Sequence, residues 1–193
     1  MAIGTVLDLA CGRSPSYWRA LGLDNNPRVW LVGVDREIAY HPCVVADLLQ
    51  PLPFKDGVAD LAIVSSYLYV PADPGQLLRE VFRVLKPGRP LWLSVPLVFP
   101  YTPEPTDHWR FTPDSVKLLL RDAGFTDLVL VPLGGRCSAA SYLLGPLLRP
   151  RWLLAPLAFW GALRVDSWLA RRRNFTPCPL GYVVMARTSW NSH

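Results

Sequence analysis

Short apolar runs that do not alternate with polar residues recur along the chain, and they constrain its fold more than any other feature. Each is four to six residues long and rich in Val, Ile, Leu or Trp; the runs span residues 5–9, 29–34, 60–65, 90–95, 128–131 and 182–186. A strand with one face in water alternates apolar and polar residues. These runs therefore predict strands buried on both faces, as in a parallel sheet between two layers of helices.

Two segments between the runs have the pattern of helices. Apolar residues recur at helical spacing in 74–85, and a Lys-Pro-Gly sequence ends that segment. The second segment, 113–123, has Thr112 as its expected N-cap, Pro113 at its first position and Gly124 after its end. Strands that alternate with helices form right-handed crossover connections. We therefore predict an α/β fold with a doubly wound, mostly parallel sheet.

Length and composition are those of one globular domain, with room for an appendage. The chain has 193 residues, of which 51% are hydrophobic and 18% are charged, so general disorder is excluded. A formal net charge of +5 at pH 7 is usually a solvated face. An anionic partner such as phospholipid is the alternative, and we expect no nucleic acid.

Cysteine usage and the N-terminal residues predict a cytoplasmic protein. Cys11, Cys43, Cys137 and Cys178 include no pair at the two-residue spacing of a zinc site or a redox dithiol, so we expect reduced thiols and no metal. The first eleven residues, MAIGTVLDLAC, are apolar like a secretion signal. They hold no basic residue and contain Asp8 where a signal core must be uncharged, so we reject that interpretation.

The sequence VLDLACGRSP, residues 6–15, turns from an apolar strand into a loop of small and turn-forming residues. In an open parallel sheet, ligands bind beyond the C-terminal ends of the strands, where the strand order reverses beside the first strand. Gly12 lets this loop pass close beneath a ligand. Asp35 ends the second apolar run, and a carboxylate there can accept hydrogen bonds from both hydroxyls of a ribose. Together these features predict an adenosine site.

Further motifs complete a resemblance to a known family. The sequence VADL at 45–48 precedes the turn QPLPFKDG and the run VADLAI, and the helix at 74–85 ends in LKPGR. From about residue 6 to residue 125, the chain resembles the class I S-adenosylmethionine-dependent methyltransferases, in particular their type 11 group. The resemblance implies a Rossmann-like sheet of seven strands, methyltransferase activity and S-adenosyl-L-methionine as the cofactor.

The resemblance also assigns the cofactor contacts residue by residue. Asp8 matches the acid that meets the ammonium group of the cofactor's methionine, directly or through water. Ser65 ends the strand that lines the methionine and substrate pocket. The other matching residues are Ala10, Cys11 and Gly12 in the glycine loop, Asp35 and the adjacent Arg36 at the ribose, and Asp47 with the backbone of Leu48 at the adenine.

Departures from the family pattern keep a second function open. Ala10 stands where the first glycine of the loop is usual, and YLY at 67–69 replaces a frequent LEH sequence. Relatives also carry helices before the first strand, whereas the first apolar run here begins at residue 5. The alternative is therefore a catalytically weak or inactive methyltransferase-like domain that binds a partner or a membrane surface. A nicotinamide dehydrogenase is disfavoured, because only Gly12 of the required G-x-G-x-x-G is present.

The loop after the run at 90–95 carries the candidate catalytic residues. Its sequence DHWRFT at 107–112 is similar to an hD.wRfT signature of a bacterial subset of the type 11 enzymes. His108 could take a proton from an acceptor hydroxyl, with Glu104 or Asp107 to orient it. Arg110 could hold an anionic group. Alternatively, Asp107 and Arg110 pair with each other, and alignment of the reactants suffices for methyl transfer without a base.

An apolar, Trp-rich segment at 138–173 separates the last two runs. Three prolines interrupt it, three arginines close it, and its longest uncharged run, 152–163, is too short to span a bilayer. We predict a helical hairpin at the cofactor edge, because the sixth strand should run parallel and the seventh antiparallel beside it. The hairpin is a lid, a homodimer contact or a helix in a membrane interface. Accordingly, we assign 133–176 to an insertion and 1–132 with 177–190 to the methyltransferase core, whose type 11-like region is 6–96.

The function predicted from the sequence is S-adenosylmethionine-dependent methyl transfer. The expected acceptor is a small molecule, a glycan or a lipid-linked molecule, with oxygen as the methylated atom. We expect a cytoplasmic enzyme, peripheral to the membrane if the insertion binds lipid.

Overall fold

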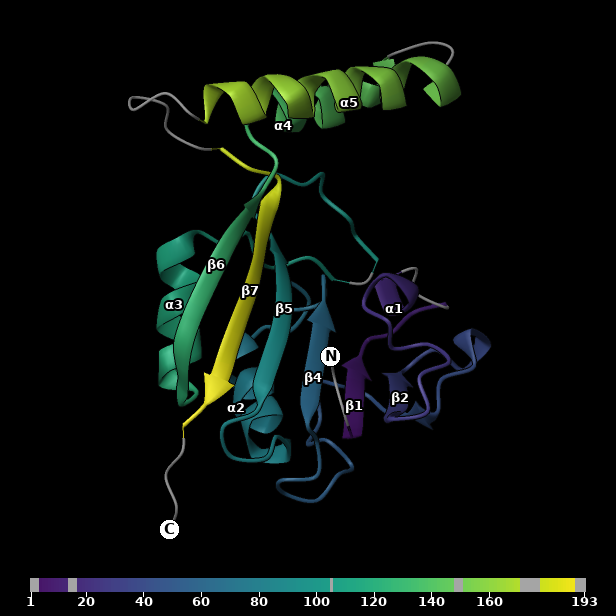
Figure 1. Ribbon diagram of the computed structural model, residues 1–193, viewed down its shortest axis with the longest axis vertical. Coiled ribbons are helices and arrows are strands. Elements are labelled where there is room, and N and C mark those ends of the chain that lie inside the picture. The colour runs from purple at the N-terminus through teal and green to yellow at the C-terminus, as the bar shows by residue number, and fades with distance from the viewer. Residues whose placement is uncertain (1–3, 14–16, 105, 148–150, 171–177, 190–193) are drawn as a thin grey trace.

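The structure is a computed structural model that describes residues 4–13, 17–104, 106–147, 151–170 and 178–189, the side chains of 151–153 excepted. A seven-stranded sheet in the order β3-β2-β1-β4-β5-β7-β6 forms its centre (Figure 1). The strands are β1 Gly4–Leu9, β2 Val29–Asp35, β3 Val44–Val45, β4 Leu61–Ser65, β5 Pro90–Pro96, β6 Phe125–Leu133 and β7 Gly181–Thr188. Every pairing is parallel except those of β7, which is antiparallel to both β5 and β6. The predicted α/β sheet is confirmed, including its antiparallel last strand.

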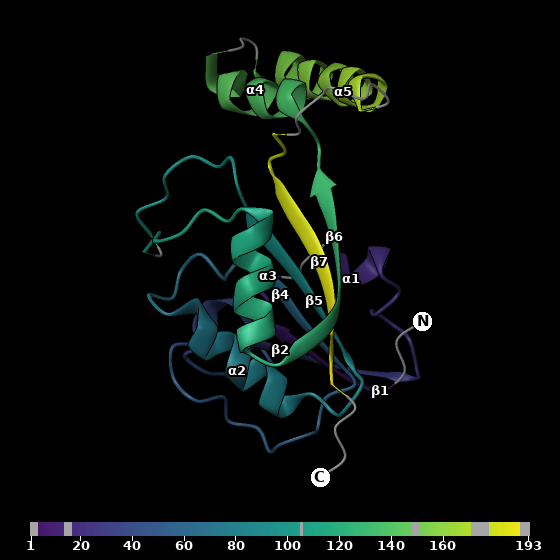
Figure 2. The same ribbon diagram turned by 90° about the vertical axis from the view of Figure 1, so that its left-hand side faces the viewer.

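Helices cover the two faces of the sheet unequally. α2 Pro74–Val84 and α3 Pro113–Asp122 pack on one face, while α1 Tyr17–Ala20 lies on the other (Figure 2). The remaining helices are α4 Arg136–Leu144 and α5 Arg151–Leu169, with the 3-10 turns η1 Ile38–Tyr40 and η2 Gly145–Leu147. Val129 and Val131 of β6 and Met185 of β7 are each about half exposed. Within the described residues, the second helical layer is therefore reduced to the four residues of α1.

Side-chain caps set where α2 and α3 begin. The Asp73 carboxylate accepts hydrogen bonds from the N–H groups of Gly75 and Gln76, at 2.8 and 3.2 Å. Thr112 and Ser115 cap the start of α3 reciprocally. The inward faces of the two helices bury Leu77, Leu78, Val81, Val84, Val116 and Leu120. Each helix therefore begins at the predicted residue and ends one residue before the predicted end.

An ionic cluster closes the N-terminal end of the sheet. Asp60 lies 2.7 Å from Lys86 Nζ and 3.2 Å from the Arg89 guanidinium. It also accepts a hydrogen bond from the N–H of Thr5 (3.0 Å). Burial alone would raise the pKa of Asp60, but the hydrogen bond from Lys86 and the other contacts outweigh it and hold that pKa below its usual range. Gly4 packs so closely here that a Cβ would lie 2.2 Å from Asp60 Oδ2.

The helices α4 and α5 form a hairpin, named here the α4–α5 hairpin (residues 136–169). It stands beyond the C-terminal end of β6, on the side of the sheet toward which the parallel strands point (Figures 1 and 2). The Asp166 carboxylate of α5 accepts hydrogen bonds from the N–H groups of Cys137 and Ser138 at the start of α4, at 2.9 and 2.8 Å. The predicted helical hairpin is present.

Among the described residues, no helix combines the length and apolar character needed to cross a bilayer. Ser14, Pro15 and the arginines at 171–173 lie outside these residues.

Backbone hydrogen bonds at Leu180 connect the base of this hairpin to the loop after β5. The N–H of Leu180 donates to the carbonyl of Leu133, the last residue of β6 (2.9 Å). The carbonyl of Leu180 accepts from the N–H groups of Leu97 and Val98, at 2.8 and 2.9 Å. A single residue therefore joins the strand that leads into α4 to the start of the 97–112 loop.

Replacing Gly4 with alanine should destabilise the protein by about 3 kcal/mol. The residue has φ +102°, and the new methyl group would overlap the Asp60 carboxylate. Gly57→Ala is the matched control, because Gly57 also has a positive φ (+61°) but has nothing within 4 Å of its Cβ position. We expect it to lose about 1 kcal/mol. Urea unfolding measures both losses, and equal losses would contradict the steric contribution of Asp60.

Candidate functional site

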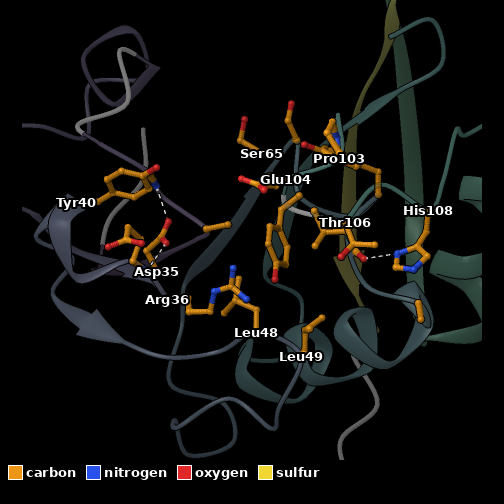
Figure 3. A pocket seen from close by; sticks show the side chains of 18 residues that line it. Asp35, Arg36, Tyr40, Leu48, Leu49, Ser65, Pro103, Glu104, Thr106 and His108 are labelled. Atoms are coloured by element: carbon orange, nitrogen blue, oxygen red, sulfur yellow. Dashed lines mark hydrogen bonds between the residues drawn. The ribbon is translucent and has the colours of Figure 1, made fainter. Parts of the chain in front are cut away.

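A cavity of about 690 Å³ opens at the C-terminal edge of the sheet, between the ends of β1 and β2 and the 97–112 loop (Figure 3). Seven of the predicted site residues line it: Ala10, Gly12, Asp35, Arg36, Leu48, Ser65 and His108. β1 lies between β2 and β4, so the strand order reverses at this point. Open α/β sheets bind ligands there. The cavity therefore brings predicted cofactor residues and the predicted base into one space.

The loop after β1 enters this cavity in a left-handed backbone conformation. Ala10 and Gly12 have positive φ angles of 59° and 60°. The N–H of Gly12 donates to one oxygen of Asp35 (2.8 Å), and the N–H of Glu37 donates to the other (2.9 Å). The Asp35 carboxylate is thus oriented by two backbone groups and keeps acceptor capacity for hydroxyl groups. At Ala10, the conformation costs about 1 kcal/mol that glycine would avoid.

Asp8 is a fully buried acid within the apolar sequence of β1. Its carboxylate accepts hydrogen bonds from the Tyr17 hydroxyl (2.9 Å) and from the indole N–H of Trp18. Burial raises the pKa of Asp8 to about 6, and the two hydrogen bonds oppose that rise. None of the ion pairs among the described residues includes Asp8. A buried carboxylate with neutral partners is suited to the ammonium group that the family resemblance implies as its partner.

Asp8 itself does not line the cavity, and the Tyr17 side chain connects Asp8 to the cavity. The Tyr17 hydroxyl that contacts Asp8 is also close to Ser65, which does line the cavity. Burial is the main cause that raises the pKa of Tyr17, so its hydroxyl stays protonated. Tyr17 is not a lining residue either, so Asp8 is connected to the cavity through the Tyr17 hydroxyl and Ser65.

Cys11 and Asp47 are two other predicted cofactor residues that do not line the cavity. Burial raises the pKa of the Cys11 thiol to about 12, so the thiol is neutral. Asp47 accepts a hydrogen bond from the N–H of Leu49 (3.0 Å) and thereby shapes the turn whose Leu48 and Leu49 side chains reach the cavity. Direct contacts of Cys11 and Asp47 with a cofactor stay predictions.

His108 lines the cavity with its imidazole held in one orientation. Its Nδ1 lies 2.7 Å from the carbonyl oxygen of Val70, and its backbone N–H donates to the carbonyl of Tyr69 (3.0 Å). Because a carbonyl oxygen can only accept, Nδ1 carries the proton. Nε2 of the neutral ring therefore keeps its lone pair, which is the arrangement a general base requires.

Asp107 and Arg110 hold the 97–112 loop together and do not line the cavity. The guanidinium donates to both oxygens of Asp107, at 2.5 and 2.7 Å, and this contact, the largest cause, lowers the pKa of Asp107 to about 2. The remaining N–H groups of Arg110 donate to the carbonyls of Phe99, Pro100 and Trp109. With every N–H donated, Arg110 has none left for a substrate anion. The two residues pair with each other, as in the alternative left open by the sequence, and their catalytic roles stay predictions.

Three tyrosines that were not predicted as site residues also line the cavity: Tyr40, Tyr67 and Tyr69. Burial raises the pKa of Tyr67 and of Tyr69, so both phenols are neutral. These two residues occupy the YLY sequence that departs from the family pattern, and that departure is the signal that could have found them. Tyr40 ends η1 and carried no such signal.

The chain is similar to methyltransferases in sequence. The family model described as a methyltransferase domain matches residues 7–93. An uncharacterized 37.1 kDa protein in transposon TN4556 of Streptomyces fradiae is 29% identical over 158 residues, with 67% of this chain and 45% of that protein covered. The chain thus spans about half the length of this curated relative.

Solved structures share the fold at lower identity. A SAM-dependent methyltransferase from Archaeoglobus fulgidus superimposes with a TM-score of 0.62 at 16% identity, covering 97% of this chain and 87% of that one. The [4+2]-cyclase SpnF superimposes with a TM-score of 0.63 at 20% identity, covering 98% and 77%. Likeness at these identities concerns the fold alone.

The raised pKa of Asp8 should make stability depend on pH between about 4 and 7. The native state keeps the Asp8 proton up to about pH 6, whereas the unfolded state loses it near 3.8. The native state is therefore stabilised by the Asp8 proton below about pH 4, and this contribution to the free energy of unfolding is lost as the pH rises through 6. Relative to Asp8→Asn, the wild type should lose up to about 3 kcal/mol over this range.

Urea unfolding at several pH values measures this difference. Asp114→Asn is the control, since the Asp114 side chain is 97% exposed and the variant keeps Asp8 and therefore the loss of stability that Asp8 causes. A pH-independent difference between the wild type and Asp8→Asn would contradict the assigned pKa.

Proposed function

We propose that this protein, whose residues 7–93 form a class I methyltransferase domain of the type 11 group, transfers a methyl group to an oxygen atom of a small-molecule, glycan or lipid-linked acceptor. S-adenosylmethionine is the cofactor, and when bound it supplies a methyl group activated by its sulfonium sulfur. The observation that carries the choice of oxygen is the fixed tautomer of His108 beside the cavity.

Two carboxylates support the donor half of the proposal. Asp35, oriented by two backbone N–H groups, accepts hydrogen bonds from the ribose hydroxyls. Asp8 lies behind the Tyr17 hydroxyl and balances the charge of the ammonium group. A cation at this point would also lower the pKa of Asp8 towards its ordinary value, because the charged form gains a partner. Donor binding therefore favours the ionised form of Asp8.

His108 supports the acceptor half of the proposal. Its Nε2 takes the proton of the acceptor hydroxyl as the oxygen gains the methyl group. The Nδ1–H group keeps its hydrogen bond to the carbonyl of Val70, which stabilises the positive charge that the ring acquires. The pair of Asp107 and Arg110 acts at a distance, by fixing the shape of the loop that presents His108.

Asp35→Ala should weaken the binding of S-adenosylhomocysteine by about a hundredfold, because two hydrogen bonds to a charged acceptor are lost. Calorimetric titration measures this binding. Asp56→Ala is the control, since Asp56 is 79% exposed and pairs with Arg83 away from the cavity. An absence of heat with the wild type at high protein concentration would count against the whole proposal.

His108→Ala should keep the binding of S-adenosylhomocysteine and lower methyl transfer by about a hundredfold to ten-thousandfold. Transfer of a tritiated methyl group from S-adenosylmethionine into a lipid extract and a set of hydroxylated small molecules measures the activity. Imidazole in solution should restore part of the rate to this variant. A variant that transfers at the wild-type rate would show that alignment alone drives the reaction.

A methyltransferase-like domain with weak or no catalysis is the second candidate function. The left-handed backbone at Ala10 favours it, because the residue is strained at the point where the loop meets the cavity. The methyl-transfer assay separates the two candidates, since the second predicts little or no transfer by the wild type.

A further inference from the structure

The α4–α5 hairpin and the adjoining η2 expose several apolar side chains. Leu157, Trp160 and Val165 of α5 are 61%, 68% and 46% exposed, and Leu147 of η2 is 76% exposed. α5 has apolar residues on all its sides, and a helix of this kind is normally buried in a protein core or in a membrane. One side of α5 packs on α4. The exposed part of α5 therefore calls for a second covering surface.

The net charge of residues 136–173, which include the hairpin, indicates which kind of surface would cover it. Residues 136–173 contain seven arginines and one acidic residue, whereas the rest of the chain contains thirteen basic and fourteen acidic residues. The single acid, Asp166, is 6% exposed, and its carboxylate is bonded to the start of α4. Arg164 is exposed among the apolar residues of α5. The segment thus combines an apolar surface with all of the net positive charge of the protein.

The position of the hairpin relates it to the cavity. The hairpin stands beyond the C-terminal end of β6 (Figures 1 and 2), and the residues that line the cavity lie at the same edge of the sheet. Tyr142 of α4 stacks on Phe99 of the 97–112 loop, with ring centroids 6.0 Å apart. Tyr101 of the same loop is 74% exposed, and His108 of this loop lines the cavity. A surface that covers the hairpin would therefore lie near the loop that presents the base.

We propose that the α4–α5 hairpin docks on an anionic lipid surface, with Leu157 and Trp160 in the interfacial zone and Arg164 at the level of the head groups. Tryptophan suits this zone because its ring is apolar and its N–H is polar, and arginine is attracted to anionic lipids. A second copy of the chain fits less well, since a symmetric contact would bring two copies of the same positively charged segment together. Nucleic acid fits less well, since proteins bind it through more polar surfaces.

Docking in this way also selects the acceptor class. Of the acceptors proposed above, a lipid or a lipid-linked molecule is the one that the bilayer would deliver to the cavity. This step rests on the proposed function, whereas the docking does not.

Flotation of the full chain with lipid vesicles tests the docking. Vesicles of phosphatidylcholine and phosphatidylglycerol in equal parts are compared with vesicles of phosphatidylcholine alone. The protein should float with the anionic vesicles and much less with the neutral ones. Raising the salt concentration should release part of it, because salt screens the attraction between arginine and the lipid.

The double variant Leu157→Gln/Trp160→Gln should lower partition into the anionic vesicles by about tenfold or more. Its matched control is Leu118→Gln/Trp30→Gln, which removes the same two residue types at positions that are 61% and 75% exposed elsewhere on the molecule. The control should float like the wild type. Urea unfolding of both variants verifies that the fold is kept, which the exposure of all four side chains favours.

A wild type that does not float, or a hairpin variant that floats like its control, would overturn the docking. Sedimentation that reveals a dimer abolished by the hairpin variant would assign the face to a second copy, and tight binding of RNA would assign it to nucleic acid. Titration with S-adenosylhomocysteine on the same preparations keeps the two proposals apart. Donor binding without flotation rejects the docking alone, and flotation without donor binding rejects the proposed function alone.

Discussion

Parallel pairing of β1 with β2 on one side and β4 on the other is the constraint on which the rest of the structure depends. The register sets Asp8 beside Gly33 and Ile63, so the three strands reach the same level before the chain leaves the sheet. The loops that follow them therefore meet around one cavity. The same register fixes Asp8 inside the apolar sheet, where the Tyr17 hydroxyl and the indole of Trp18 compensate for the lost water.

The sequence was sufficient for the strands because burial on both faces leaves an unbroken apolar run. It underestimated β6, which the structure extends from residues 128–131 to Phe125–Leu133. Asp127, with φ 51° next to a register shift, and Pro132 interrupt the apolar pattern there. α1 was also not predicted, since four residues carry no periodicity; it is held by packing of Tyr17 against Trp92 of β5.

The candidate site was predictable where position along a strand decides the role, and not where hydrogen-bond partners decide it. Asp35 ends β2, so its place at the cavity follows from the sheet. Arg110 was assigned to a substrate because its residue type suits an anion, but the carbonyl groups that occupy its donors become neighbours only in the folded loop. The backbone angle of Ala10 likewise depends on the turn that the loop makes, which the residue type alone does not reveal.

The hydrogen bonds of Leu180 have a structural consequence. Asp166 makes the two helices of the hairpin one body, and that body continues into β6, whose last carbonyl is bonded to Leu180. The opposite side of Leu180 is bonded to the start of the loop that carries His108. The hairpin is therefore connected through backbone hydrogen bonds to the start of the loop whose His108 lines the cavity. The Asp166 carboxylate is the one side chain on this route, and the groups that follow it, from Leu133 through Leu180 to Leu97 and Val98, are backbone groups.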